Sequence, residues 1–222
     1  QSIHWINLST TCEPNLFNKF FPFFLFLLFT LPMSLSTLNH YWESYLTELE
    51  KRPVQTKALT AGVLSVVSDV IAQKLQGAEL SNLDLTSLRH QFLIGLIIRG
   101  PLVHYWYELM GRLCKAVGIS AADEQTTPVV VGKVALDQLV FSPPFNLLYF
   151  YVIGFLQNTP HSVIQEKIAR DFVPLMIANW KVWPLINLVN FKFVPAKLQV
   201  LFGNIVSIFW MTYVIKMTAA KK

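Results

Sequence analysis

The sequence is poor in charge and in cysteine. Only 14% of its 222 residues are Asp, Glu, Lys or Arg, while 53% are hydrophobic, against about 25% charged residues in soluble domains. A domain of this size cannot hide that much apolar surface from water, which argues against an ordinary cytosolic enzyme. Cys12 and Cys114 stand far apart without a CxxC partner, which excludes a disulfide scaffold, a cysteine-rich zinc site and a cluster-binding protein.

Catalytic and cofactor motifs are also missing. The sequence has no Walker loop, GxGxxG, GxSxG or kinase signature, so we expect neither an enzyme nor a bound cofactor. His90, His104 and His161 lack the HxxxH or HExxH spacing of metal sites, and we expect no metal. The net charge of +5 comes from scattered Lys and Arg at the ends of apolar segments. This pattern favours membrane flanks over nucleic-acid binding.

Long apolar segments are what the sequence does contain, and a helix needs about 20 such residues to cross a bilayer. Four segments are long enough: residues 56–75, 92–113, 129–156 and 198–215. We therefore predict an all-α integral membrane protein, a bundle of about four transmembrane helices. With four spans, Lys133 and Lys192 fall on opposite faces of the membrane.

Residues 173–194 are apolar too, but they are interrupted by polar and aromatic side chains. The segment contains Lys181, Lys192, Trp180, Trp183 and Pro184. Trp and Lys are typical of the membrane–water interface. We prefer an additional Trp-rich interfacial segment here, with a fifth span as the alternative.

The N-terminal residues 1–32 differ in character from the rest, and the first methionine is Met33. We interpret residues 1–32 as an atypical leader or as translated upstream sequence. No linker or repeat divides the chain after that point. The expectation is a single integral membrane domain over residues 33–222.

Three charged residues fall within three different apolar segments: Asp69, Arg99 and Asp137. A charge near mid-bilayer costs at least about 2.5 to 3.5 kcal/mol on insertion scales unless it is paired or hydrated. We therefore expect the three to face one another. Two interpretations stay open: they line a hydrated path and set its charge preference, or Arg99 bridges the two carboxylates as a static contact between helices.

A stripe of small and polar side chains runs along the first predicted span. Its members, spaced three or four residues apart, are Gly62, Ser65, Asp69, Ala72 and Gln76. This spacing places them on one helix face, and small residues allow close approach of a second helix. We expect that face to point inward.

His104 lies near the end of the second predicted span and is followed by three aromatic residues and a glutamate. Imidazole changes its charge between about pH 5 and 8, so His104 is a candidate gating residue. The alternative is a place in the interfacial aromatic belt, where such side chains are common.

One cluster of residues resembles the signature of the Mpv-type family, which includes the twenty-two-kilodalton peroxisomal membrane protein. The signature residues are Asn179, Trp180, Trp183, Pro184, Asn190, Phe191, Val194 and Pro195. Motifs earlier in the chain agree in order, and the likeness runs from about Tyr41 to Tyr213.

The resemblance implies four transmembrane helices in the peroxisomal membrane or, as in some relatives, the mitochondrial inner membrane. It also implies a channel for small solutes, non-selective or weakly cation-selective, with a part in handling reactive oxygen species. The partners would be the lipid bilayer and the peroxisomal membrane import machinery. Four helices alone enclose little volume, so conduction favours a homo-oligomer. A structural or scaffold protein that recruits partners is the competing function.

Overall fold

The computed structural model describes residues 35–219 and the side chains of residues 36–210. Within residues 35–219 the ordered elements are all helical, which confirms the predicted all-α fold. The chain divides into two compact units, Gln1–Thr56 and Lys57–Lys222. The leader, residues 1–32, lies outside the described residues, and the single domain over 33–222 stays a prediction.

The first unit contains helix α2, Leu35–Lys51, and the first turn of α3, Pro53–Leu75. Tyr45 and Leu49 are its buried apolar side chains. Pro53 begins α3, where its missing N–H costs nothing. The turn is closed by the Thr56 hydroxyl, which donates to the carbonyl of Glu48 at 3.1 Å.

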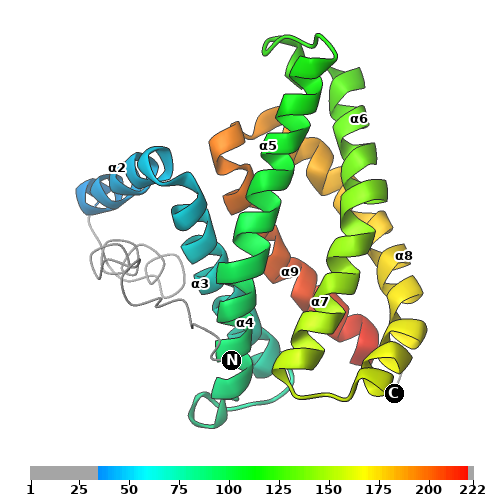
Figure 1. Ribbon diagram of the computed structural model, residues 1–222. Coiled ribbons are helices and arrows are strands. Elements are labelled where there is room, and N and C mark those ends of the chain that lie inside the picture. Colours follow the sequence, from blue (N-terminus) through cyan, green and yellow to red (C-terminus); the bar gives the residue numbers. More distant parts are fainter. Residues whose placement is uncertain (1–34, 220–222) are drawn as a thin grey trace, which may run out of the picture. The chain divides into compact units, whose positions relative to one another are not determined.

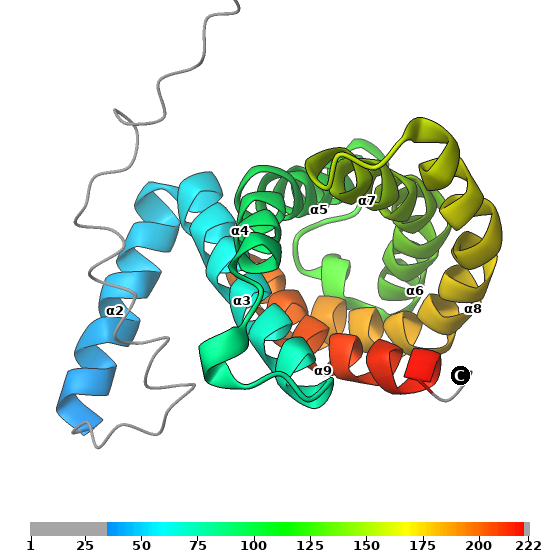
Figure 2. The ribbon, with the colours of Figure 1, turned by 90° about the horizontal axis from the view of Figure 1, so that it is seen from below.

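The second unit contains the rest of α3 and all later helices. In chain order these are η2 (Leu80–Asn82), α4 (Leu85–Leu93), η3 (Ile94–Arg99), α5 (Gly100–Ala116), η4 (Asp123–Gln125), α6 (Thr127–Leu136), η5 (Asp137–Phe141), α7 (Ser142–Leu156), α8 (His161–Phe193), η6 (Ala196–Leu198) and α9 (Gln199–Ala219). Figure 1 shows these helices running alongside one another. Viewed from below, helices α5 to α9 form a ring (Figure 2).

Two of the short elements, η3 and η5, are π-helical turns inside longer helices. Each is followed closely by a proline, Pro101 or Pro143, which lacks the N–H of a normal helical bond. The Gly100 N–H bonds to the carbonyl of Gly95, and the Ser142 N–H to that of Asp137, five residues back in both cases. The helices therefore accommodate these prolines through π turns and continue past them.

Three helices among the described residues are long and apolar enough to cross a membrane: Pro53–Leu75, Thr127–Leu156 and His161–Phe193. The first and second match the predicted spans 56–75 and 129–156. The predicted span 92–113 forms a helix with a π turn but is not among the three. The last predicted span, 198–215, begins an apolar helix whose side chains are described only as far as Trp210.

The segment 173–194 requires a correction. It lies inside the continuous helix α8, which is itself long enough to span, so the preferred interfacial interpretation gives way to the alternative of a span. The Lys192 ammonium also contacts the carbonyl of Gln125 at 2.7 Å. Lys192 thus lies on the same face as the α5–α6 connection and Lys133. The Lys and Trp residues of segment 173–194 suggested an interface, but the apolar side chains between them continue the helix.

Helix α3 crosses η3 and α5 at very short range, because small residues meet on both sides. A Cβ added to Gly95 would lie 2.5 Å from the carbonyl oxygen of Ala61, and one added to Gly100 would lie 2.5 Å from the Cα of Ala58. Ser65, on the predicted stripe, accepts a hydrogen bond from Arg99 across the same crossing. The absence of side chains thus allows direct backbone contact between the helices.

We predict that Gly95→Ala destabilises this crossing, because the new methyl group meets backbone that cannot rotate away. Overpacking of this kind lowers the free energy of unfolding by about 1–3 kcal/mol. Gly132→Ala is the matched control, because a Cβ there meets nothing within 4 Å. Thermal unfolding in detergent, followed by tryptophan fluorescence, measures both. Equal unfolding temperatures for the two variants would contradict the close crossing.

Candidate functional site

The buried carboxylate of Asp137 lies at the meeting point of α5, η5 and α8. Its side chain accepts three hydrogen bonds: from Trp106 Nε1 at 2.9 Å, from Gln138 Nε2 at 2.9 Å and from Asn187 Nδ2 at 2.6 Å. Only 6% of Asp137 is exposed. No Lys, Arg or His of the described residues forms an ion pair with it. Neutral donors alone therefore stabilise this negative charge.

The π turn supplies a second contact to the same place. Because the Ser142 N–H bonds to Asp137 and Pro143 has no N–H, the carbonyl of Gln138 has no helical donor. The indole N–H of Trp180 on α8 donates to that carbonyl at 3.2 Å. The proline thus creates the acceptor that α8 binds.

Aromatic rings hold the donor Trp106 in position. Its indole stacks on Phe141, with ring centres 4.9 Å apart and planes 13° apart, and Phe141 stacks on Phe145. Phe141 belongs to η5 and Phe145 to α7. Stacking limits rotation of the indole, so its N–H stays directed at Asp137.

A further buried amide, Asn190, continues the polar contacts toward α9. Its Nδ2 donates to the Tyr107 hydroxyl at 3.4 Å and to the Gln199 carbonyl at 3.3 Å. The contact between the Trp183 and Trp210 rings fixes the antiparallel pairing of α8 and α9 further along. Counting between these two contacts places Asn204, on α9, at about the level of Asn187.

We call these five buried residues the polar layer: Asp137, Gln138, Asn187, Asn190 and Asn204. Three of its side-chain atoms have no hydrogen-bond partner among the described residues: Gln138 Oε1, Asn190 Oδ1 and Asn204 Nδ2. Buried polar atoms in proteins nearly always have a partner, protein or water. The polar layer can therefore accept two further hydrogen bonds, through Gln138 Oε1 and Asn190 Oδ1, and donate one, through Asn204 Nδ2.

The other two charged residues lie elsewhere, which corrects the expectation that all three face one another. Asp69 accepts from Gln73 on its own helix at 3.0 Å. Arg99 donates to Ser65 at 3.3 Å, and no ion pair among the described residues joins it to Asp69 or Asp137. A π turn adds a residue to the helical turn and so changes the direction of Arg99 relative to a regular α-helix.

His104, the candidate gating residue, is also outside the polar layer. Its Nδ1 lies 3.1 Å from the ammonium of Lys57, which is only 8% exposed. The imidazole ring also lies beside Tyr105. Because an ammonium only donates, Nδ1 of His104 is the acceptor in this pair. A gating role for His104 stays a prediction.

The signature residues Asn179 to Phe191 all lie on α8, and Val194 and Pro195 follow its end. Asn179, Asn190 and Phe191 are buried. The sequence analysis did not propose Trp106, Gln138, Asn187 or Asn204 as site residues. The helical spacing of Trp180, Trp183, Asn187 and Asn190 could have identified one face of α8, had segment 173–194 been treated as a spanning helix.

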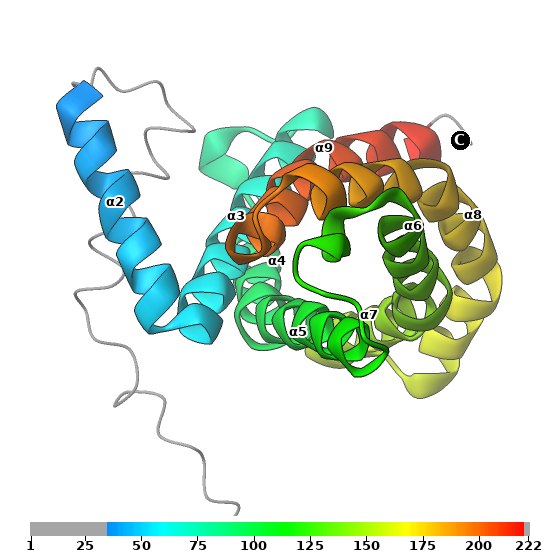
Figure 3. The same ribbon diagram turned by 90° about the horizontal axis from the view of Figure 1, so that it is seen from above.

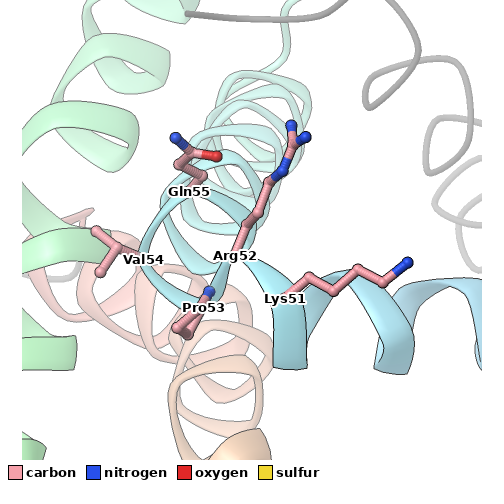
Figure 4. A pocket seen from close by; sticks show the side chains of 5 residues that line it. All are labelled: Lys51, Arg52, Pro53, Val54 and Gln55. Carbon is pink, nitrogen blue, oxygen red and sulfur yellow. The ribbon is translucent and has the colours of Figure 1, made fainter.

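A separate hollow of about 330 Å³ lies in the first unit, at the corner between α2 and α3. It is lined by the consecutive residues Lys51 to Gln55, and the side chains of Lys51 and Arg52 point in different directions (Figure 4). Residues from a single stretch of chain that diverge in this way do not form a convergent binding site. The polar layer is therefore the stronger candidate.

Comparison with known proteins agrees with the features of α8. Residues 154–214 match the family described as Mpv17 / PMP22. PXMP2/4 family protein 3 of Dictyostelium discoideum is 39% identical over 191 residues, which cover 86% of this chain and 96% of that protein. The chain belongs to the Mpv17 / PMP22 family.

Other members of the Mpv17 / PMP22 family are named for two organelles. Peroxisomal membrane protein PMP22 of Arabidopsis thaliana is 32% identical over 76% of this chain and 84% of its own length. Mitochondrial inner membrane protein Mpv17 of Danio rerio is 30% identical over 78% and 93%. No solved structure matches the chain. With its three candidate spans, the chain is an integral membrane protein, as the sequence predicts.

We predict that Trp106→Phe destabilises the protein, because the stacking ring remains while a donor to a buried carboxylate is lost. A hydrogen bond to a charged group contributes about 1.5–3 kcal/mol to the free energy of unfolding. Trp183→Phe is the control, since it removes the same ring atoms from a ring contact. Thermal unfolding in detergent compares the two, and an equal loss of stability in both would contradict the role of the indole N–H.

Proposed function

We propose that this Mpv17 / PMP22 family member is a channel or permeability-controlling protein for small solutes, with the polar layer lining its path. The observation that carries this proposal is a buried carboxylate accompanied by three buried amide atoms that lack a hydrogen-bond partner among the described residues, all on apolar helices. We place the protein in the peroxisomal membrane, by its likeness to the peroxisomal relatives, with the mitochondrial inner membrane as the alternative.

The cost of the polar layer supports a function beyond packing. Each buried polar atom without a partner costs about 1–3 kcal/mol, and an apolar side chain of similar size would avoid that cost. Water or a polar solute passing through the ring would complete the missing hydrogen bonds. A path therefore explains why three unsatisfied polar atoms stay buried in the bundle.

The charge of Asp137 determines which solutes such a path favours. Its carboxylate is held by neutral donors, while Lys133, four residues earlier, pairs with Glu124 and Arg99 contacts Ser65. An uncompensated negative charge raises the local concentration of cations over anions. We infer a weak preference for cationic and neutral solutes.

The apolar surface of the bundle bears on the partners of the protein. Only 6% of the apolar 18-residue window of the Thr127–Leu156 helix is buried within the protein, so its apolar side chains contact lipid or a second copy of the chain. We also propose that the protein forms a homo-oligomer and is inserted by the peroxisomal membrane import machinery. It would then take part in handling reactive oxygen species.

A scaffold that recruits partners without transport is the competing function. Exposed apolar side chains on α8 favour it, since Trp180 is 46% and Leu185 69% exposed. Its expected signature is loss of partner binding when residues 180–195 are changed, with no change in solute flux. Lipid also accounts for such exposure in a spanning helix.

We predict that Asp137→Asn lowers the cation preference of the full-length protein in planar bilayers. The substitution keeps the shape of the side chain and removes its charge, so the ratio of K⁺ to Cl⁻ permeability should fall severalfold toward one. Arg99→Gln should leave that ratio unchanged, because Arg99 lies outside the polar layer.

The control is Glu166→Gln, an exposed carboxylate on the same helix as Asn187, which should conduct like the unmodified protein. If correctly folded protein gives no conductance, the channel proposal is rejected in favour of the scaffold. Conductance with unchanged selectivity in Asp137→Asn would keep the channel but remove Asp137 from its path.

A further inference from the structure

The connection between α5 and α6 folds inward over one end of the helical ring. We call residues 117–126, which include η4, the α5–α6 loop. Seen from above, the loop lies within the outline of the ring instead of extending away from it (Figure 3). The view from below shows the same loop inside the ring (Figure 2).

Two lysines on different helices hold the loop in this place. Lys133 of α6 forms an ion pair with Glu124 at 2.7 Å, and these side chains are only 12% and 24% exposed. Lys192 near the end of α8 donates to the Gln125 carbonyl at 2.7 Å and to the Thr127 hydroxyl at 3.4 Å. The loop is thus attached to both sides of the ring through its η4 turn.

Bonds within the loop make it one compact unit. The Ser120 hydroxyl donates to the Asp123 carboxylate at 2.6 Å, and the Thr126 hydroxyl donates to the Asp123 carbonyl at 2.7 Å. The joint with α5 is Gly118, whose φ of +82° is one that other residues rarely adopt. Rotation at Gly118 could therefore move the loop as a whole once the two lysine contacts are released.

The loop end of the ring leads to the polar layer. Lys192 follows Asn190 by two residues on α8, and the fully buried Asn190 contacts Tyr107 and Gln199. Asn187 and Asp137 lie one turn further along. The buried side chains of Met110, Val130 and Phe191 pack together at this end, so the loop and this apolar cluster together separate the aqueous phase from the first amide of the polar layer.

We propose that the α5–α6 loop is a gate, kept closed by the Glu124–Lys133 ion pair and by the contacts of Lys192. This inference rests on the proposed channel function and adds its regulation. Loss of the ion pair shifts the loop toward an open position, and solute then reaches the polar layer more often. The gate belongs to the chain itself and requires no additional subunit.

Lys133→Gln tests the gate with two measurements on the full-length protein in lipid vesicles. Hydrogen exchange of the amides in residues 117–126 reports release of the loop, and efflux of K⁺ from loaded vesicles reports opening. A partly buried ion pair of this kind should change both by about three- to tenfold. Glu124→Gln should act in the same direction, and the double exchange Glu124→Lys with Lys133→Glu should restore slow exchange and low efflux.

The matched control is Glu108→Gln, which removes an ion pair of 2.8 Å to Arg112 on the exposed face of α5. It should leave both measurements unchanged. Faster exchange without faster efflux, in a protein that conducts, would overturn the gate and leave the channel in place. Unchanged exchange in Lys133→Gln would show that the pair does not hold the loop, which also overturns the gate. No efflux from any variant, despite a released loop, would reject both proposals.

Discussion

The structure depends on the hydrogen bonds that stabilise one carboxylate buried away from water. Asp137 is buried inside an apolar helical bundle, where an unpaired charge is expensive, and its three donors come from α5, from η5 and from α8. Each donor fixes the rotation of the helix that carries it. Asp137 therefore helps to set the position of α8 relative to α5 and η5, together with the contacts of Asn190 with Tyr107 and of Trp180 with Gln138.

The prolines of the bundle make that solvation possible. Pro143 would leave a carbonyl without a donor in a regular helix, and the π turn before it moves this free carbonyl to Gln138, where Trp180 binds it. Ser142 and Pro143 also bring Phe141 beside the ring of Trp106. A residue type that usually weakens helices is used here to create contacts between helices, as is common for π turns at functional positions.

Much of this arrangement was within reach of sequence analysis. Apolar runs predicted the spans 56–75 and 129–156, and an isolated acidic residue in such a run identified Asp137. The signature residues were found, but the segment 173–194 that holds most of them was assigned to the interface instead of to the spanning helix α8. The partners of Asp137 were not predictable, because Trp106 and Asn187 are 31 and 50 residues away and no periodicity relates helices of unknown rotation. The expected contact of Arg99 with the two carboxylates rested on the cost of burying an unpaired charge, and that argument could not identify Ser65 as its partner.

The lengths of two helices relate the protein to the thickness of its membrane. At 1.5 Å per residue, the 30 residues of Thr127–Leu156 and the 33 of His161–Phe193 extend to roughly 45 and 50 Å, whereas a hydrocarbon core measures about 30 Å. Such helices must tilt, bend or emerge into the headgroups, and α8 carries Pro174 and Pro184 inside it. Organelle membranes differ in thickness by a few Å, so this excess length allows the same bundle to adapt to bilayers of more than one thickness.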